Sequence, residues 1–261
     1  MTNRTVGYAP QELMAIVIAR DLEDGLVGMS GANSEIPVAA SLLAQRLHAP
    51  NLTLLTSSGF VNPKPVELFP SSCEYRFTRG AEAILNFYEV FENSERGLDF
   101  MFYGGIQIDQ YGNVNLTYVG GTYDRPRFRG PGLANVSMGV MCPRIYLYPT
   151  NHTKNTFVER VDFVTIPGWL DGPEGRRRAG IETPGPRLVV SPRAVLDFEP
   201  ATRRMRLVSV HEHSSVEDVV ANTSFELVIP DQVPITPPPT VEELRTLREE
   251  IDVAGVLRSG A

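Results

Sequence analysis

The sequence predicts an α/β fold with an open, mostly parallel sheet flanked by helices and an added antiparallel hairpin region. Short aliphatic runs such as Leu52–Thr56 alternate with amphipathic stretches in the first half of the chain, which is typical of buried parallel strands joined by helices. Further on, two runs of alternating polarity flank Gly112-Asn113, which indicates a hairpin. The 261 residues contain no internal repeat or compositional break, so we expect a single domain over residues 1–261.

Composition and charge limit the possible partners. Hydrophobic residues make up 42% and charged residues 21% of the chain, which is ordinary for a globular protein. The formal net charge of -7 argues against non-specific binding to nucleic acid or a membrane surface, since both are anionic. No apolar run reaches the roughly 20 residues that cross a bilayer. There is no signal-peptide pattern, and Cys73 and Cys142 form no spaced motif, so a reduced, cytoplasmic protein is expected.

The N-terminal third reads as helix, strand, loop and helix. A first helix is expected from Pro10 through Arg20, because proline is tolerated in an opening turn and apolar residues recur on one face. Asp24-Gly25 ends it. The short run Leu26–Met29 then indicates a strand, Ser30–Ser34 a loop of small residues, and Ile36–Leu47 a second helix.

The middle and later parts of the chain add strands. The run Asp99–Tyr103 ends at Gly104-Gly105, after which Ile106–Asp109 and Val114–Thr117 are the two sides of the predicted hairpin. Glycine and asparagine between them can adopt the positive φ angles of a tight turn. Further strands are expected at Arg187–Val190, Ala194–Phe198 and Met205–Val210.

The C-terminal part combines an extended segment with a final helix. Residues 223–239 are rich in proline and are expected to be extended. Thr240 and Glu243 form a capping box, in which the threonine oxygen accepts from the third helical amide and the glutamate reaches back. A last helix is therefore expected from Val241 to about Ile251.

Three segments of the chain carry a family resemblance. The most specific is a C-terminal signature at His213–Leu227, Pro237–Leu244 and Leu247–Asp252, which closely resembles the closing signature of β-type subunits of the family I coenzyme A (CoA) transferases. Gly104–Asp109 with Gly112-Asn113, and the glycine-rich loop Gly130–Asn135, resemble two further motifs of that family. The resemblance implies the CoA-transferase fold, a CoA thioester as substrate with no permanently bound cofactor, and an α-type partner subunit in an αβ or α2β2 assembly.

The glycine-rich loop is the candidate for contact with the thioester. Gly130-Pro131-Gly132 can present backbone amides without side-chain obstruction, either to a carbonyl oxygen or to an anionic group. A purely structural turn is the alternative. A dinucleotide site is discounted, because Asn135 stands where a third glycine would be needed and Pro143 follows soon after.

The chain departs from the family pattern after the strand at Leu52–Thr56. Transferases of this family have a glutamate there, followed by asparagine or serine and then glycine, whereas this chain has Ser57-Ser58-Gly59. In the transferase reaction the carboxylate attacks the acyl-CoA and then holds CoA as a thioester. A serine cannot run that cycle. A different alignment would place the glutamate at Glu35 or Glu67.

Loss of the nucleophile resembles one branch of the family, the actinobacterial two-subunit hydrolases that open the last steroid ring in cholesterol breakdown. The resemblance implies carbon-carbon bond hydrolysis in a cyclic β-diketone CoA thioester, with the catalytic carboxylate on the α-type partner. A base would activate water, and hydrogen-bond donors would stabilise the leaving enolate. Glu35 is the secondary catalytic candidate in this chain. The expected pocket residues are Ser57, Ser58, Gly59, Gly104, Gly105, Gln107, Gly130, Pro131, Gly132 and Asn135.

Other interpretations stay open at this stage. A CoA transferase that moves CoA between carboxylic acids would leave a trappable covalent thioester, and a non-catalytic effector-binding protein on the same scaffold would be stable without a partner. Arg176-Arg177-Arg178 either contact CoA phosphates or form a solvated loop. His211 and His213 share a strand face by their spacing, but no third ligand stands at a clear spacing, so no metal site is expected.

Overall fold

The computed structural model describes residues 7–65, 67–94, 97–133 and 136–259, and the chain divides into two compact units. Unit 1 consists of Met1–Leu26, Ser30–Leu85 and Pro237–Ala261, so both ends of the chain belong to it. Unit 2 consists of Val27–Met29 and Asn86–Thr236. The expectation of one domain over residues 1–261 stays a prediction.

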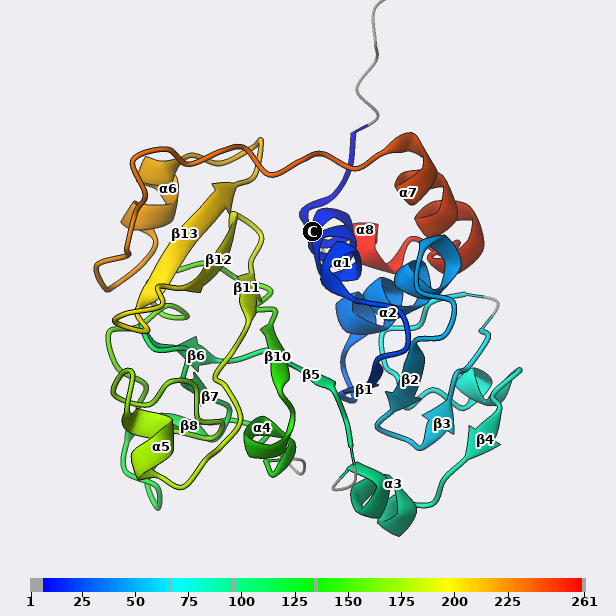
Figure 1. Cartoon of the computed structure of the whole chain (residues 1–261), viewed down its shortest axis with the longest axis horizontal. Coiled ribbons are helices and arrows are strands. Elements are labelled where there is room, and N and C mark those ends of the chain that lie inside the picture. The colour runs from blue at the N-terminus through cyan, green and yellow to red at the C-terminus, as the bar shows by residue number, and fades with distance from the viewer. Residues whose placement is uncertain (1–6, 66, 95–96, 134–135, 260–261) are drawn as a thin grey trace, which may run out of the picture. The chain divides into compact units, whose positions relative to one another are not determined.

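Unit 1 is mainly helical. Its elements are α1 (Pro10–Asp21), α2 (Glu35–Leu47), β2 (Thr53–Thr56), β3 (Phe60–Val61), the 3-10 turn η1 (Tyr75–Thr78), β4 (Ala83–Ile84), α7 (Val241–Thr246), the π-helical turn η2 (Leu247–Ile251) and α8 (Val256–Ser259). Helices α1 and α2 pack on each other, and α7, η2 and α8 return to them from the far end of the sequence (Figure 1). The strands β2, β3 and β4 pair antiparallel.

Apolar side chains hold the helices of unit 1 together. Leu13 and Ile16 of α1 and Leu43 of α2 are fully buried, and each such side chain contributes about 2 kcal/mol of transfer free energy. Pro10 opens α1 at a position where its missing N–H has no helical partner to lose. Both N-terminal helices are confirmed, with α2 beginning at Glu35, one residue before the predicted start.

Two ion pairs connect the ends of the chain within unit 1. The Glu12 side chain is fully buried, and the Arg248 guanidinium donates to both of its carboxylate oxygens at 2.7 Å. Arg20 donates to Glu243 in the same bidentate way, also at 2.7 Å. Glu243 additionally closes the predicted capping box, since it accepts from the Thr240 N–H at 2.7 Å and its own N–H donates to the threonine hydroxyl at 3.1 Å. The last predicted helix is therefore confirmed, as α7 followed by η2.

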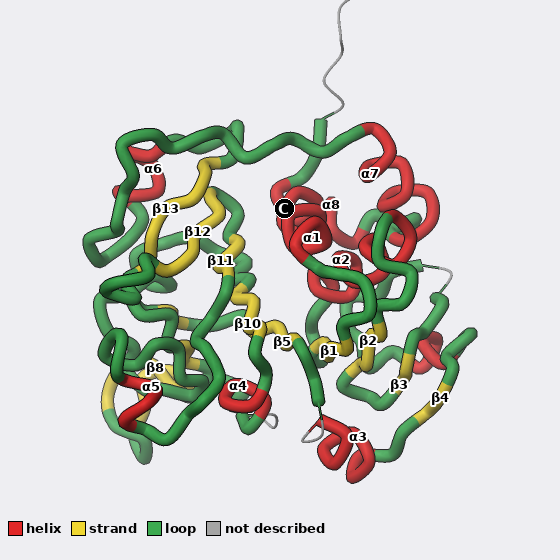
Figure 2. Tube along the Cα trace, viewed as in Figure 1, coloured by secondary structure: helices red, strands yellow, loops and turns green. Residues whose placement is uncertain are grey.

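Unit 2 contains the main sheet and most of the loops (Figure 2). Its elements are β1 (Val27–Ser30, of which Ser30 belongs to unit 1), α3 (Phe87–Ser94), β5 (Phe100–Tyr103), β6 (Gln107–Ile108), β7 (Val114–Asn115), β8 (Tyr118–Gly121), β9 (Pro126–Arg129), α4 (Met138–Met141), β10 (Arg144–Leu147), α5 (Gly175–Arg178), β11 (Leu188–Val190), β12 (Ala194–Phe198), β13 (Met205–Val210) and α6 (Val216–Ala221).

Six strands of unit 2 follow one another in the order β13-β12-β11-β10-β5-β1. Neighbours from β1 to β11 run parallel, and β11, β12 and β13 pair antiparallel. The buried rings of Phe100, Phe102 and Tyr146 pack on one another, with centroids 5.3 and 5.4 Å apart between Phe102 and its two neighbours. The predicted α/β fold with an open, mostly parallel sheet and added antiparallel hairpins is confirmed.

The predicted hairpin is present as β6 and β7, in which Gln107 lies opposite Asn115. The Asp109 carboxylate organises its tip by accepting from the N–H groups of Tyr111 at 3.0 Å and of Asn113 at 3.1 Å. Gly112 has a φ of +71°, which glycine adopts without strain. A second hairpin follows at once, formed by β8 and β9, and we call residues 118–129 the arginine arm. The arginine arm was not predicted.

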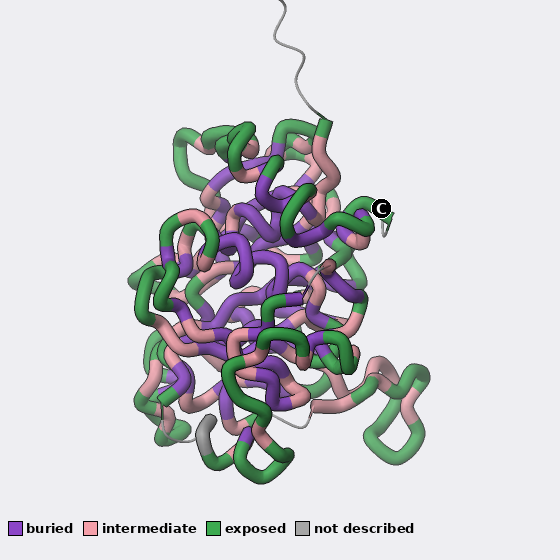
Figure 3. The backbone as a smooth tube through the Cα atoms, turned by 90° about the vertical axis from the view of Figure 1, so that its right-hand side faces the viewer, coloured by how far each residue is buried: buried purple, intermediate pink, exposed green. Residues whose placement is uncertain are grey.

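Burial differs between the regular elements and the loops. In Figure 3 the buried stretches run through the interior, whereas the exposed ones are mostly loops and loop tips. Among the helices that the structure describes, none is long and apolar enough to cross a membrane.

Candidate functional site

Ser57-Ser58-Gly59 form the tight turn between β2 and β3 in unit 1. The Gly59 N–H donates to the Thr56 carbonyl at 2.9 Å, and the next N–H, that of Phe60, donates to the Thr56 hydroxyl at 3.1 Å. Gly59 has a φ of +84°, and a Cβ there would lie 2.1 Å from the Leu85 carbonyl oxygen. Only glycine fits, so the turn holds Ser57 at a defined place just after the strand.

The Ser57 hydroxyl is surrounded by other small polar groups. Its Oγ lies 3.2 Å from the Ser72 Oγ and 3.5 Å from the Cys73 Sγ. Ser72 in turn donates to the Gly31 carbonyl at 2.5 Å. Burial raises the pKa of the Cys73 thiol, but hydrogen bonds from Ser57, Ser58 and Ser71 outweigh it and leave the pKa lowered. In the described part of the chain no carboxylate contacts Ser57.

Neither Glu35 nor Glu67 forms a hydrogen bond or ion pair with the described residues of that turn. Glu35 begins α2 and is partly buried, and its carboxylate has no hydrogen bond or ion pair with a described residue. Glu67 is bound by Arg76 at 3.2 Å. A catalytic role for Glu35 therefore stays a prediction.

A hollow of about 520 Å³ in unit 2 lies beyond the carboxyl ends of two neighbouring parallel strands. Gly105 follows β5 and Asn151 follows β10, and a ligand in an open α/β sheet typically binds at such strand ends. Its lining residues are Gly105, Ile106, Val119, Phe128, Thr150, Asn151, Asn155 and Thr156. The volume suits a small ligand, and apolar walls with a few amides and hydroxyls suit an acyl or pantetheine chain.

Gln107 supports this region without facing the hollow. Its side-chain oxygen accepts from the Asn115 amide at 2.7 Å and from the Asp162 N–H at 3.0 Å, while its amide donates to the Asp162 carboxylate at 3.2 Å. The same carboxylate accepts from the N–H of Gly120 in the arginine arm at 2.8 Å. Gln107 thus fixes the arm relative to the hairpin.

The glycine-rich loop begins where the arginine arm ends. The Gly130 N–H donates to the Thr117 carbonyl at 2.8 Å, and the Gly132 N–H donates to the Leu116 carbonyl at 2.9 Å. Pro131 has no N–H to offer. A Cβ on Gly130 would lie 2.2 Å from the Leu116 carbonyl oxygen, so this close approach requires glycine. Among the described residues of the loop, Leu133 alone keeps an unpaired N–H for an oxyanion; Asn135 lies outside the described residues.

A larger hollow of about 790 Å³ lies near the tip of the β6–β7 hairpin, lined among others by Asp109, Tyr111, Glu159 and Asp171. Burial raises the pKa of Asp109, although hydrogen bonds from Asn113 and from the backbone oppose the effect. Because those bonds shape the hairpin tip, we assign Asp109 a structural role. This hollow contains none of the predicted pocket residues.

Arg176 has a structural role, and its two neighbours are exposed. Its guanidinium is buried and donates to the carbonyls of Thr183 at 2.7 Å and of Pro167 at 2.9 Å. Burial lowers the pKa of Arg176 to about 10. Arg177 and Arg178 instead form exposed ion pairs with Glu174 and Asp171. The three arginines lie in and around α5, and Arg176 is not available to a phosphate.

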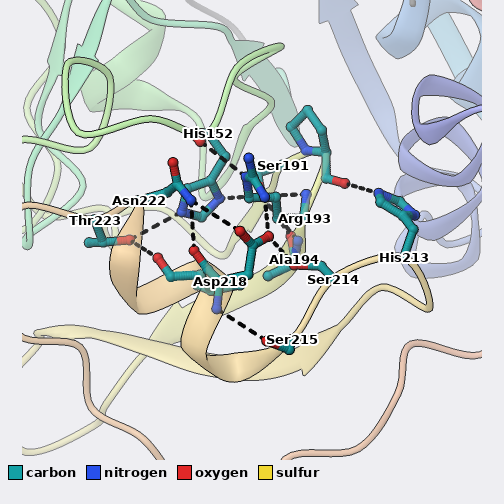
Figure 4. Close-up of polar contacts among 12 residues, drawn as sticks. His152, Ser191, Arg193, Ala194, His213, Ser214, Ser215, Asp218, Asn222 and Thr223 are labelled. Atoms are coloured by element: carbon teal, nitrogen blue, oxygen red, sulfur yellow. Dashed lines mark hydrogen bonds and ion pairs between the residues drawn. The ribbon is translucent and has the colours of Figure 1, made fainter.

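The C-terminal signature builds a hydrogen-bonded network in unit 2 (Figure 4). The Ser215 hydroxyl caps α6 by accepting from the Asp218 N–H at 3.2 Å, and Asp218 pairs with Arg193. Buried His152 bonds to Ser191 at 2.7 Å through Nδ1 and to Thr223 at 3.1 Å through Nε2. Burial, aided by the Arg193 charge, lowers the pKa of His152 to about 3. His152, at the centre of the network, is therefore neutral, and we assign the network a structural role.

The two C-terminal histidines differ in exposure. His211 is fully buried and bonds to Thr236 at 2.9 Å, whereas His213 is exposed and bonds to the Pro192 carbonyl at 2.8 Å. Their spacing did not predict this difference, because β13 ends at Val210 and a turn follows. No cluster of three metal-ligating side chains occurs among the residues that the structure describes.

Comparison with known proteins identifies the family. Residues 11–222 match the coenzyme A transferase family model, and the chain belongs to that family. It is 36% identical to the B subunit of glutaconate CoA-transferase from Acidaminococcus fermentans, over 94% of this chain and 93% of that protein. The crystal structure of that glutaconate CoA-transferase superposes with a TM-score of 0.86 at 31% identity, covering 96% of this chain and 97% of the other.

More distant relatives bear on the hydrolase expectation. The B subunit of 3-oxoadipate CoA-transferase from Pseudomonas knackmussii is 28% identical, over 92% of both chains. The cholesterol ring-cleaving hydrolase IpdB subunit of Rhodococcus jostii is 25% identical, over 86% of this chain and 85% of its own. The resemblance to the hydrolase branch had suggested that this branch is nearest to the chain, and this is corrected, because the glutaconate transferase chain is more similar.

Proposed function

We propose that this chain is the B-type subunit of a two-subunit enzyme that acts on a CoA thioester, and that residue 57 forms no covalent intermediate with CoA. Ser57 carries this proposal: it stands at the turn after β2 where the family's transferases have glutamate, and its recorded partners are the hydroxyl of Ser72 and the thiol of Cys73. A carboxylate is needed to conserve the acyl activation energy as an anhydride and a thioester.

The proposal of a partner subunit rests on the relatives and not on a feature of this chain. Two of the relatives described above are named as B subunits of CoA transferases, and the third as a subunit of a hydrolase. The chain covers nearly their full length, so we propose that it also acts with a second, α-type subunit. In this proposal the general base lies on the partner, and the present chain contributes the hollow and the glycine-rich loop.

Hydrolytic carbon-carbon cleavage is one reaction that is compatible with a site without the nucleophile. A base on the partner would activate water to attack a ring ketone, and the N–H of Leu133 is the described amide that could meet the developing negative charge. A steroid-derived cyclic β-diketone CoA thioester is the narrower substrate proposal, supported by the likeness to the IpdB subunit.

CoA transfer between carboxylic acids is the second candidate, and the comparisons favour it over the steroid hydrolase. Both relatives with the higher identities are transferase subunits. In this chain transfer would require a carboxylate from another position, with Glu35 as the candidate here, or from the partner.

Co-expression with an α-type subunit and mass spectrometry would separate the two reactions. The complex is incubated with a cyclic β-diketone acyl-CoA in one assay and with acetyl-CoA plus a dicarboxylic acid in another. A ring-opened product that has gained water and kept CoA supports hydrolysis. Movement of CoA to the acid, with a hydroxylamine-sensitive adduct on the protein, supports transfer instead of hydrolysis. An adduct that peptide mapping places on Ser57 would refute the proposal for residue 57.

A gain-of-function variant sharpens that result. Ser57→Glu restores the carboxylate of the transferases, whereas Ser57→Gln adds the same bulk without a nucleophile. If residue 57 is what separates this chain from its transferase relatives, the glutamate variant alone forms a trappable CoA thioester. An adduct in both variants, or in the unmodified complex, would place the nucleophile elsewhere.

A further inference from the structure

The arginine arm presents a row of positive charges on a chain that is acidic as a whole. Arg125, Arg127 and Arg129 stand at alternate positions, so their side chains lie on one side of the arm. All three are exposed. The guanidinium groups of Arg125 and Arg127 have no recorded partner among the described residues, while the formal net charge of the chain is -7. Asp124, at the turn, is the arm's own acidic residue.

Aromatic rings lie on the same side of the arm. The Arg129 guanidinium lies 4.9 Å from the centre of the Tyr123 ring and donates to the Tyr123 carbonyl. Tyr118, Tyr123 and Phe163 form a cluster with ring centroids 5.7 to 6.3 Å apart. Tyr123 is 57% exposed and Phe163 is 38% exposed, although large apolar side chains are usually covered.

Arginines without ion-pair partners, next to exposed aromatic rings, are suited to bind a nucleotide. Guanidinium groups pair with phosphates in bidentate fashion, and aromatic or guanidinium planes stack on a base. A CoA thioester has both parts, since an adenine, a 3′-phosphate and a diphosphate follow its pantetheine chain. The arm also leads into Gly130 of the glycine-rich loop, and its other side supplies Phe128 to the 520 Å³ hollow.

Resting on the proposed function, we infer that the outer side of the arginine arm binds the nucleotide part of the CoA thioester. Arg125 and Arg127 pair with its phosphates, and Tyr123 offers a surface on which adenine stacks. The acyl-bearing end lies towards the hollow and the glycine-rich loop. The ribbon is two strands wide, about 5 Å between strands, so one extended ligand can follow its edge from one side to the other.

The test compares substrates with and without the nucleotide. The complete complex with its α-type subunit is assayed with acyl-CoA, acyl-dephospho-CoA and acyl-pantetheine. Arg125→Ala with Arg127→Ala is expected to raise KM for acyl-CoA roughly tenfold to a hundredfold, because hydrogen bonds to charged groups are lost. KM for acyl-pantetheine is expected to stay unchanged. Arg245→Ala, at an exposed arginine of α7 in unit 1, serves as the matched control and should alter neither value.

Four outcomes overturn the inference. An unchanged KM for acyl-CoA in an active double variant removes the arm from nucleotide binding. An equal rise for acyl-CoA and acyl-pantetheine assigns the effect to the acyl end instead. Loss of the α-type subunit on gel filtration assigns the arm to the subunit interface. A wild-type complex that neither converts acyl-CoA nor binds CoA in calorimetry refutes the proposed function itself, and the inference with it.

Discussion

The two units bury their polar groups in different ways. Unit 1 buries charge in an ion pair, with Arg248 donating to both oxygens of the fully buried Glu12. Unit 2 buries the Arg176 guanidinium against backbone carbonyls, but it also buries two histidines in neutral hydrogen-bonded networks, of which His152 with Ser191 and Thr223 is the clearer. A buried ion pair resists mild acid, because its partner holds the carboxylate in the charged form. A buried neutral histidine does not, because the unfolded chain takes up a proton that the folded chain refuses.

The two units also carry different candidate residues. Unit 1 places Ser57 in a tight turn among hydroxyl groups and a thiol, which suits precise placement of a small side chain. Unit 2 contains the hollow, the glycine-rich loop and the arginine arm, which suit binding of an extended ligand. Changes in unit 2 should therefore affect substrate binding, whereas residue 57 should affect the kind of reaction only when it supplies a carboxylate.

Mild acid should destabilise unit 2 before unit 1, and this is the largest effect we expect. Burial lowers the pKa of His152 to about 3 and of His211 to about 4, against an ordinary 6.5. Their stabilising contribution is complete above pH 6.5 and falls as the pH drops towards 4, by several kcal/mol at about 1.4 kcal/mol per pKa unit. For Glu12, burial raises the pKa but bonds from Arg248 and Ala9 lower it overall, so its contribution is lost only below about 4.5.

Hydrogen exchange by peptide mass spectrometry, corrected for intrinsic pH dependence, would follow the two units separately. Peptides from β10 to β13 should lose protection between pH 6.5 and 4 while those of α1 and α2 keep it. His213→Gln, at the exposed histidine, is the control and should leave the profile unchanged. Simultaneous loss of protection in both units would contradict the comparison.

Removal of the guanidinium from the buried ion pair should destabilise unit 1. Arg248→Ala leaves the Glu12 carboxylate buried, with Arg258 at 3.9 Å as its remaining cation, so we expect a loss of about 3 kcal/mol in the free energy of unfolding. Arg177→Ala removes an exposed pair and should change it by less than about 0.5 kcal/mol. Chemical denaturation monitored by circular dichroism measures both. Equal losses in the free energy of unfolding would mean that the burial of Glu12 does not make its ion pair more important for stability than an exposed one.

A methyl group on the glycine-rich loop should impair turnover more than stability. Gly130→Ala forces the loop away from the Leu116 carbonyl, and a shift on this scale near a thioester costs on the order of 100-fold in kcat/KM. Gly7→Ala is the control, since a Cβ there meets nothing within 4 Å. Steady-state kinetics of the complex, with a thermal melt of each variant, distinguish the two effects. An active Gly130→Ala enzyme would exclude the loop from the site.

Sequence reasoning predicted those regular elements whose signals are local. The helix at Pro10–Asp21, the hairpin at Asp109 and the capping box at Thr240 depend on neighbours within a few positions. Helices α3 and α6, strand β10 and the arginine arm were missed. Strand β10 is short and directly follows Pro143, so it gave no clear strand pattern. Strand β9 alternates arginine with proline and phenylalanine instead of showing the apolar pattern that is typical of a strand.

The members of the candidate site stay a prediction, and their contacts could not be predicted from the sequence. The family resemblance singled out Gln107 and the glycine-rich loop, yet no local pattern shows that the Gln107 amide is occupied by Asp162 or that two loop amides are already paired. Arg176 likewise sits in a run of three arginines, and only tertiary packing separates the buried one from its exposed neighbours. Contacts of this kind join residues far apart in the sequence.

The smallest effect is expected where the sequence departs most from the transferases. Ser57→Ala removes a hydroxyl that bonds to Ser72 and Cys73, and if serine is neither nucleophile nor base, kcat/KM of the complex should change by less than about threefold. The companion variant Cys73→Ser, which keeps a hydrogen-bonding group beside Ser57, should behave in the same way. A hundredfold loss in Ser57→Ala with an unchanged melting temperature would mean that unit 1 supplies chemistry after all. The separation of binding in unit 2 from passive positioning in unit 1 would then fail, and a serine-based acyl transfer would replace it.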